Sequence, residues 1–337
     1  MSKRITLSFI LILVALLMVI VGTIIKKSSK NNVVSPRRLT ENDTNVQELP
    51  VFIESLRKRN YPASEIAIEE TLTSGVNYQR HIVSYKSDGL KIYGLLTIPN
   101  SSRPSNGYPT IIFLHGYVSP KTYITTNDYI ATQDGLARSG FITFKPDLRG
   151  HGKSQGDATG AHFSESYVVD TLNALSALKI DKDVDSKRIG IWGHSNGGEI
   201  GLKAMVVSKE IKASVFWAGV VGSFQDMLET YNSRIPFMRR NAPDLVVKYG
   251  SPSANPTFWN KLDPYSSLDD ISGPIQLHHG TADSSVPIEL SIHLKNALEK
   301  EGKRAELYKY NGANHNFNGD SFATAMQRSV DFFKKYL

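Results

Sequence analysis

The residue with the clearest potential for chemistry is Ser195, which stands in the sequence GHSNGG at positions 193–198. An apolar run at 189–192, typical of a buried strand, precedes this sequence, and a run typical of a helix follows it at 199–207. A serine at a sharp strand-to-helix turn presents its hydroxyl above a sheet, and small residues two positions before and after it let strand and helix approach closely. The motif therefore predicts a nucleophilic serine at position 195 rather than an ordinary glycine-rich turn.

A serine hydroxyl is a weak nucleophile at neutral pH, so a base must take its proton and an acid must orient that base. His315 follows the last predicted strand, in the sequence NGANHNF at 311–317, and Asp283 follows the strand before it, in HGTAD at 279–283. The chain order serine, aspartate, histidine is one of the known orders of such a triad. We predict a catalytic triad of Ser195, Asp283 and His315, with a structural histidine and a turn or helix-capping aspartate as the alternatives at the last two positions.

Acyl transfer through a serine also needs two donors for the oxyanion of the tetrahedral intermediate. The backbone N–H of Asn196 is one candidate, because it lies at the N-terminus of the predicted helix, where the helix dipole also favours negative charge. The second donor should come from the sequence HGY at 115–117, which follows the predicted strand 111–114, and we predict the N–H of Tyr117. The alternative at Tyr117 is a tight turn with a packing tyrosine.

The sequence DLRGHGKS at 147–154 brings a carboxylate, a guanidinium and an imidazole together in one loop. The same residue types can form a catalytic cluster or a buried ion pair with a structural role. We predict an ion-paired structural loop that supports the neighbouring serine turn.

The elements that must position these residues alternate along the chain. Short apolar runs, typical of buried parallel strands, are separated by amphipathic runs, typical of helices on both faces of a sheet. Two earlier runs, at 81–85 and 90–98, predict an antiparallel hairpin at the sheet edge, and residues 51–72 look helical, with an interruption at Pro62. The predicted parallel strands are residues 108–114, 141–145, 188–192, 213–217, 275–278 and 305–310. This order predicts an α/β domain with a mostly parallel, doubly wound sheet.

Residues 218–273 form an insertion between two of the predicted strands. Aromatic and methionine side chains are mixed with arginines in this insertion. The composition indicates a small helical cap over the site, at about 220–272, that would set acyl and leaving-group preference. The alternative is a surface excursion that only packs on the core.

From about Asn77 to the C-terminus, the chain resembles the α/β-hydrolase superfamily and, in detail, the catalytic domain of the prolyl oligopeptidase family of serine peptidases. The shared features are HG at 115–116, the loop 147–154, the serine turn 193–198, DPYS at 263–266, and residues 280–287 and 312–317. The resemblance implies an α/β-hydrolase fold and the activity of a serine peptidase. However, HGY at 115–117 also resembles the oxyanion loop of acetyl esterases related to acetylxylan esterase, which leaves the choice between peptide and ester open.

A membrane segment is predicted before this domain. Residues 5–25 carry no charged side chain, and a helix of that length, at a rise of about 1.5 Å per residue, matches the thickness of a bilayer core. A cleaved signal peptide and a buried core helix are the alternatives. The predicted organisation is a tail at 1–4, a transmembrane anchor at 5–25, a polar linker at 26–50, a helical lead-in at 51–76 and the hydrolase domain at 77–337. Peptidases of the resembled family usually carry a β-propeller before the catalytic domain, and we expect none here.

The side of the membrane on which the domain lies is less directly indicated. Basic residues are more numerous just after the predicted anchor than before it, which by the positive-inside rule favours the cytoplasm. The order of a short basic N-terminus before an apolar run is that of a secretion signal, and the polar linker suits a domain held away from a surface. We predict an extracytoplasmic domain.

Charge and cysteine content exclude several classes of protein. The formal net charge is +7, but seven basic and no acidic residues precede Glu41, which leaves 32 basic and 32 acidic residues in the rest of the chain. A neutral body behind a basic, apolar leader fits a membrane surface better than nucleic acid, so nucleic-acid binding is not expected. The absence of cysteine excludes disulfides, a thiolate zinc site and a cysteine nucleophile. Because phosphate-cradling motifs are missing as well, we predict no metal, nucleotide or organic cofactor.

Together these features predict a serine hydrolase that cleaves an ester or a peptide bond of a small substrate through an acyl-serine intermediate. The first hypothesis is a peptidase similar to the prolyl oligopeptidase family. The alternatives are a carboxylic-ester hydrolase for small acyl groups and a binding protein that carries the triad without using it.

Overall fold

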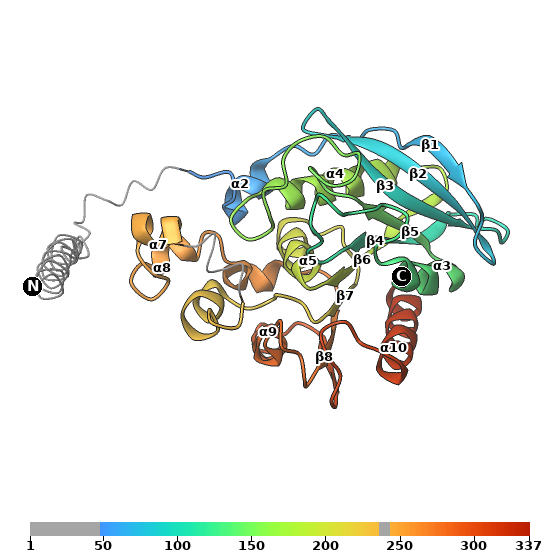
Figure 1. Cartoon of the computed structure of the whole chain (residues 1–337). Coiled ribbons are helices and arrows are strands. Elements are labelled where there is room, and N and C mark those ends of the chain that lie inside the picture. Colours follow the sequence, from blue (N-terminus) through green and yellow to red (C-terminus); the bar gives the residue numbers. More distant parts are fainter. Residues whose placement is uncertain (1–47, 236–242) are drawn as a thin grey trace, which may run out of the picture. The chain divides into compact units, whose positions relative to one another are not determined.

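The apolar runs of the sequence form one mixed sheet in residues 48–235 and 243–337, the part of the chain that the computed structural model describes (Figure 1). The strands lie in the order β1-β2-β3-β5-β4-β6-β7-β8-β9. Neighbours from β1 to β5 in this order pair antiparallel, and those from β5 to β9 pair parallel. The strands are β1 (Ala67–Leu72), β2 (Tyr78–Ser87), β3 (Leu90–Pro99), β4 (Tyr108–Leu114), β5 (Ile142–Pro146), β6 (Val184–His194), β7 (Ser214–Trp217), β8 (Ile275–Gly280) and β9 (Ala305–Tyr310).

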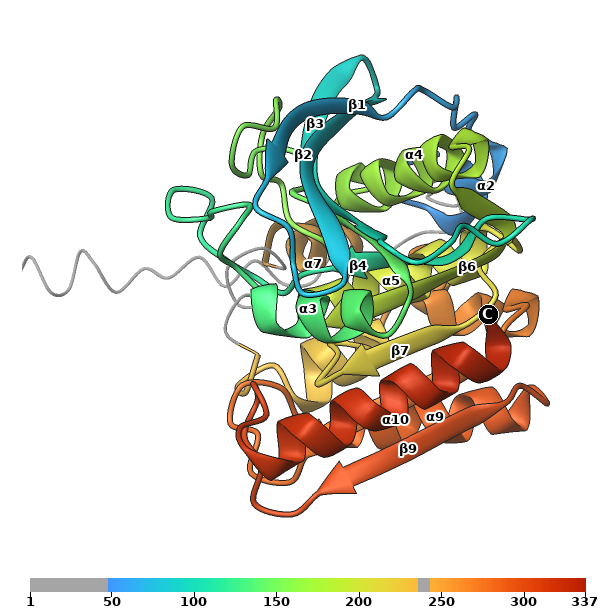
Figure 2. The same cartoon turned by 90° about the vertical axis from the view of Figure 1, so that its right-hand side faces the viewer.

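Helices cover both faces of the sheet (Figure 2). The longer ones are α3 (Ile130–Arg138), α4 (Ser166–Ile180), α5 (Asn196–Val207), α9 (Ile288–Lys300) and α10 (Asp320–Tyr336), and α2 (Ile53–Lys58) is a short one. The helices α4, α5 and α9 pack on one face, whereas α3 and α10 pack on the other. This arrangement is the predicted doubly wound architecture, which is confirmed.

The alternation of side chains along the central strands explains why both faces need a cover. In β4, Ile112 and Leu114 belong to the apolar core beneath α4 and α5, while Ile111 and Phe113 belong to the core beneath α3 and α10. All four side chains are completely buried. A strand that buries both sets of its side chains is stable only between two layers of helices.

The predicted hairpin is confirmed, since β2 and β3 pair antiparallel, but it does not form the edge of the sheet. The prediction of helix over 51–72 is wrong for its second half: α2 ends at Lys58, and β1 pairs antiparallel with β2. Most side chains of β1 are exposed, so its sequence shows no buried face. Pairing with β2 and the contacts of Glu69, whose carboxylate accepts from Ser84 Oγ at 2.6 Å and lies 2.7 Å from Lys91 Nζ, hold the strand in place.

The insertion after β7 consists of short helical segments in the residues that the structure describes. They are the π-helix η2 (Asp226–Thr230), α7 (Pro243–Tyr249), α8 (Pro256–Trp259) and the 3₁₀ helix η3 (Pro264–Asp270). Asp263 caps η3, because its carboxylate accepts from the N–H of Tyr265. It also accepts from the N–H of Phe224 at 2.9 Å, which ties the two ends of the insertion together.

The predicted fold class needs one correction. The α/β-hydrolase part of that prediction agrees with the structure, but no helix in residues 48–235 and 243–337 is long and apolar enough to cross a bilayer. The transmembrane helix predicted at 5–25 lies outside the described residues, as do the tail at 1–4 and most of the linker at 26–50. The described residues therefore form an α/β-hydrolase fold without a helix that could span a membrane.

Candidate active site

Ser195 lies at the carboxyl edge of the sheet, between the last residue of β6 and the first residue of α5. Its backbone angles are φ 53° and ψ −118°, a conformation that a non-glycine residue adopts only under strain. A Cβ on Gly193 would lie 2.5 Å from the carbonyl oxygen of Gly197, and a Cβ on Gly197 would lie 2.1 Å from that of Leu114. Any larger residue at 193 or 197 would therefore open the turn.

Neighbouring chain segments hold the strained serine in place. The N–H of Ser195 donates to Trp217 O at 3.1 Å, and its carbonyl oxygen accepts from the N–H of Val220 at 3.0 Å. A conformation of this kind costs about 1–3 kcal/mol and persists only where the surroundings determine it. The serine turn predicted at 193–198 is therefore present, and it is held by β6, β7 and α5.

The structure brings Asp283 and His315 together from two different loops. Asp283 follows β8 and His315 lies between β9 and α10, and His315 Nδ1 is 2.8 Å from Asp283 Oδ2. The other carboxylate oxygen accepts from the N–H groups of Ser285 and Val286. Burial alone would raise the pKa of Asp283, but the hydrogen bonds from His279, His315 and Val286 hold that pKa below its usual range. Asp283 is therefore a carboxylate that can orient the imidazole and stabilise its charge.

His279 is a partner of Asp283 that the sequence did not reveal. Its Nε2 is 3.2 Å from Asp283 Oδ2 and 3.1 Å from Val286 O, and its Nδ1 is 2.7 Å from Ser291 Oγ. Because a carbonyl oxygen only accepts, Nε2 carries a proton. The position of His279 four residues before the predicted acid was a usable signal in the sequence.

The contact between the serine turn and the loop of His315 is made by His194, the residue before Ser195. Within the described residues no hydrogen bond joins the Ser195 hydroxyl to His315, which is common before a substrate binds. The rings of His194 and His315 lie 4.7 Å apart, between centroids, and His194 Nε2 is 3.0 Å from His315 O. The loop that carries His315 thus rests on the residue directly before Ser195.

The two predicted oxyanion donors border one cavity of about 280 Å³. Asn196 is the first residue of α5, so its N–H has no partner within the helix. Tyr117 lies in the loop after β4, and the residue is 72% exposed, which disagrees with the alternative of a packing tyrosine. A Cβ on Gly116 would lie 3.0 Å from the Cβ of Ser195, so this loop packs directly against the serine. That the two N–H groups hold an oxyanion stays a prediction.

A buried polar cluster underlies Asn196. Its side-chain oxygen is 3.2 Å from His162 Nε2, and the other ring nitrogen of His162 contacts the carboxylate of Glu199. Lys203 Nζ lies 2.8 Å from the second oxygen of Glu199, and burial lowers the pKa of Lys203 to about 7. The cluster holds the N-terminal part of α5, and its sequence signal is weak because His162 lies 34 residues before Asn196.

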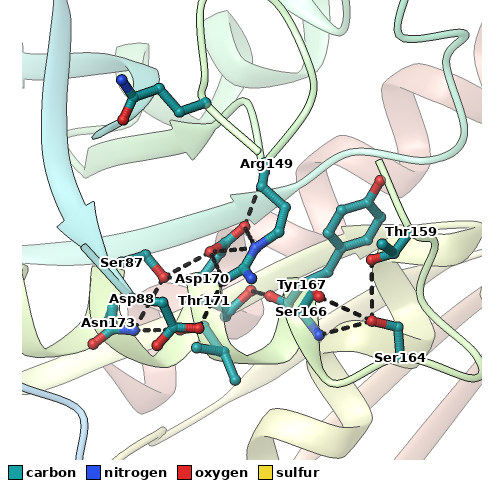
Figure 3. A network of polar contacts seen from close by, with 12 residues as sticks. Ser87, Asp88, Arg149, Thr159, Ser164, Ser166, Tyr167, Asp170, Thr171 and Asn173 are labelled. Atoms are coloured by element: carbon teal, nitrogen blue, oxygen red, sulfur yellow. Dashed lines mark hydrogen bonds and ion pairs between the residues drawn. The ribbon is translucent and has the colours of Figure 1, made fainter. Parts of the chain in front are cut away.

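The loop 147–154 is ion-paired, as predicted (Figure 3). Arg149 Nη2 lies 2.6 Å from Asp170 Oδ1, and its Nε lies 3.1 Å from both carboxylate oxygens. Asp170 is completely buried in α4 and also accepts from Ser87 Oγ, which in turn accepts from the amide of Asn173. Arg149 therefore anchors its loop to α4 and to the end of β2 rather than contributing to the site.

The sheet order, the strained serine after β6 and the hydrogen-bonded aspartate and histidine after β8 and β9 define a serine hydrolase of the α/β-hydrolase fold. The family model of the prolyl oligopeptidase family matches residues 128–337, and the chain belongs to that family. The resemblance noted from the sequence is thereby confirmed, and the chain is a serine hydrolase.

Curated relatives include two bacterial peptidases. The chain is 28% identical to "Uncharacterized peptidase YtmA" of Bacillus subtilis over 238 residues, which cover 70% of this chain and 86% of that protein. It is 25% identical to "Uncharacterized peptidase YuxL" of the same organism over 296 residues, which cover 79% of this chain but only 42% of that protein. The chain thus spans less than half of the longer relative.

Solved structures with the same fold include both peptidases and esterases. A putative dipeptidyl aminopeptidase IV from Bacteroides ovatus superposes with a TM-score of 0.63 at 20% identity, over 77% of this chain and 36% of that one. An acetyl xylan esterase from Paenibacillus sp. R4 superposes with a TM-score of 0.64 at 18% identity, over 85% of this chain and 92% of that one. At these identities the likeness establishes the fold and leaves the substrate open.

Proposed function

We propose that this chain is a serine peptidase that cleaves an amide bond of a small peptide through an acyl intermediate on Ser195. The observation that carries the proposal is the 2.8 Å hydrogen bond between His315 and Asp283 beside the strained serine. The choice of an amide is supported by the family and by the relatives described as peptidases.

In the first half of the reaction, His315 Nε2 takes the hydroxyl proton of Ser195 while the serine oxygen attacks the carbonyl carbon. The carbonyl oxygen becomes an oxyanion, which the N–H groups of Asn196 and Tyr117 stabilise. Asp283 stabilises the imidazolium that forms, through the bond to Nδ1. The carbon–nitrogen bond then breaks, and the leaving amine takes the proton from His315.

In the second half, a water molecule gives a proton to His315 and attacks the acyl carbon. The new tetrahedral intermediate collapses, the acid product leaves, and His315 returns the proton to Ser195. An ester would follow the same steps with an alcohol as the leaving group. The triad chemistry therefore does not by itself select between the two substrates.

A panel of substrates tests the proposal. The full chain and Ser195→Ala are compared on aminoacyl and prolyl arylamides and on p-nitrophenyl acetate and butyrate. We expect the wild-type protein to release the arylamine and Ser195→Ala to release none. Rapid ester turnover without arylamide cleavage would reject the peptidase in favour of the esterase, and equal turnover by both proteins would reject Ser195 as the nucleophile.

A further inference from the structure

Three loops of the candidate site meet at one buried side chain, that of His194. Its Nδ1 is 2.7 Å from the hydroxyl of Tyr129, and its Nε2 is 3.0 Å from the backbone oxygen of His315. The same hydroxyl accepts from the N–H of Gly116 at 2.9 Å. His194 is covalently next to Ser195, so this chain of hydrogen bonds joins the oxyanion loop, the serine turn and the histidine loop.

The direction of each of these hydrogen bonds is fixed by the two terminal groups, the carbonyl oxygen of His315 and the N–H of Gly116. The carbonyl oxygen of His315 can only accept, so the proton of His194 sits on Nε2. Burial, together with the nearby His315, lowers the pKa of His194 to about 3, so the ring is neutral at pH 7 and Nδ1 accepts from Tyr129. The Tyr129 hydroxyl therefore donates to His194 and accepts from Gly116. Every group in this series of hydrogen bonds therefore has a partner for its donor or acceptor role.

The backbone around these groups shows that the arrangement is imposed. Tyr129 has φ 62° and Phe317, two residues after His315, has φ 54°, and both values are rare for large side chains. Asp283 holds only the Nδ1 end of the His315 ring, and the carbonyl group of the same residue is held by His194. The base is thus fixed at two points, one on its side chain and one on its backbone.

We propose that His194 and Tyr129 are positioning residues that hold the general base and the oxyanion loop in register with Ser195. The inference rests on the proposed function. Its physical basis is that a shift of about 1 Å in a catalytic group can cost about 10²-fold in rate. Neither side chain takes part in a proton transfer to the substrate.

A pair of substitutions at His194 separates this role from simple packing. In His194→Gln the side-chain amide reaches the place of Nε2 and can still donate to His315 O. In His194→Asn the shorter amide reaches only the place of Nδ1, so the contact with Tyr129 remains and the donor to His315 O is lost. We expect His194→Asn to lower kcat by about 10-fold to 100-fold with KM nearly unchanged, because a base in the wrong place slows chemistry more than binding.

The conservative variant is the control. His194→Gln should keep a kcat within a few-fold of the wild type while its melting temperature matches that of His194→Asn. Wild-type kcat values in both variants would overturn the inference, because the donor to His315 O would then be irrelevant. If the wild type were itself inactive on every substrate, the proposed function would fail instead.

A spectroscopic readout does not depend on turnover. The proton on His315 Nδ1, hydrogen-bonded to Asp283, gives a downfield imidazole resonance that disappears in His315→Ala. We expect this resonance to persist in His194→Gln and to shift or broaden in His194→Asn. An unchanged resonance in His194→Asn would overturn the inference even in the absence of a substrate.

Tyr129 is tested in the same way. Tyr129→Phe removes the hydroxyl that orients His194 and Gly116, and we expect a loss of kcat of about tenfold or more. Tyr61→Phe is the control, because it removes a hydroxyl that donates to Leu56 O of α2, outside the site, and should leave kcat unchanged. Equal kcat values in the two variants would contradict a positioning role for Tyr129.

Discussion

At the scale of single residues, the candidate site combines one strained residue with one firmly held ion. Ser195 is kept in an unfavourable backbone conformation by bonds to Trp217 and Val220, so its hydroxyl is presented without further rearrangement. Asp283 accepts from four groups, two of them imidazoles, and stays ionised although it is buried. Both features place the cost of the catalytic geometry in the folding of the chain rather than in the reaction.

The first prediction concerns the triad. Ser195→Ala and His315→Ala should each lower kcat by about 10⁴-fold to 10⁶-fold, because triad residues act as a unit. Asp283→Asn should lower kcat somewhat less, since the base His315 remains in the site. Steady-state kinetics on whichever substrate of the panel is cleaved will measure this, with circular dichroism as the check of folding. A folded His315→Ala variant with wild-type kcat would contradict the assignment.

At the scale of elements, the site depends on loops that are anchored far from the chemistry. Arg149 ties the loop after β5 to α4 through Asp170, and this loop borders the cavity next to the candidate oxyanion donors. The side chain of Asp170 is completely buried, and that of Arg149 is 11% exposed. Removal of Asp170 would leave Arg149 with only Asp88 as a partner, at 3.2 Å and with a side chain that is 30% exposed, and so would remove the buried part of its charge compensation.

The second prediction follows from that ion pair. Asp170→Ala should reduce the free energy of unfolding by about 3–5 kcal/mol, the range for breaking a buried pair. Glu299→Ala removes a carboxylate whose side chain is 49% exposed and should cost less than about 1 kcal/mol. Urea unfolding monitored by tryptophan fluorescence gives both values. Similar losses for the two variants would show that the Arg149–Asp170 pair does not anchor the loop.

The elements also show what the sequence could and could not predict. The buried strands and the loops that carry Ser195, Asp283 and His315 were predictable, because strand periodicity and motif position are local properties. β1 was not, since its side chains are exposed and its stability comes from pairing with β2. In the sequence, His194 is only the residue that flanks Ser195, and His279 is only the end of a strand, because their partners, Tyr129 and Ser291, lie 65 and 12 residues away.

At the scale of the whole molecule, both apolar cores of the sheet must exist before the site does. The described residues include β1, β2, β3 and β4, which lie before the region matched by the family model and complete the sheet beside β5.

The predicted extracytoplasmic location stays a prediction, because the residues on which it rests lie outside those that the structure describes.

The third prediction concerns how the free energy of unfolding depends on pH. Asp147 is completely buried, and burial raises its pKa to about 6 despite hydrogen bonds from Thr125 and Tyr123. An unfolded aspartate has a pKa of about 3.9. Between these two values the folded state binds more protons than the unfolded state, so this group makes the free energy of unfolding fall as the pH rises from about 4 to 6.

Asp147→Asn should remove that contribution. The difference in unfolding free energy between the variant and the wild type, measured by urea titration at pH 4, 5, 6 and 7, should therefore change in favour of the variant up to pH 6 and stay level above it. A difference that is constant from pH 4 to pH 7 would show that Asp147 does not titrate in this window.

The most direct test of the central claim is the mapping of a covalent adduct. A fluorophosphonate reacts with a serine only when a neighbouring base and an oxyanion site activate it. We predict one adduct per chain in the wild type, located at Ser195 by peptide mass spectrometry, none in Ser195→Ala and greatly slowed labelling in His315→Ala. A wild-type protein that is not labelled, or an adduct that persists in Ser195→Ala, would contradict the assignment of Ser195 as the nucleophile.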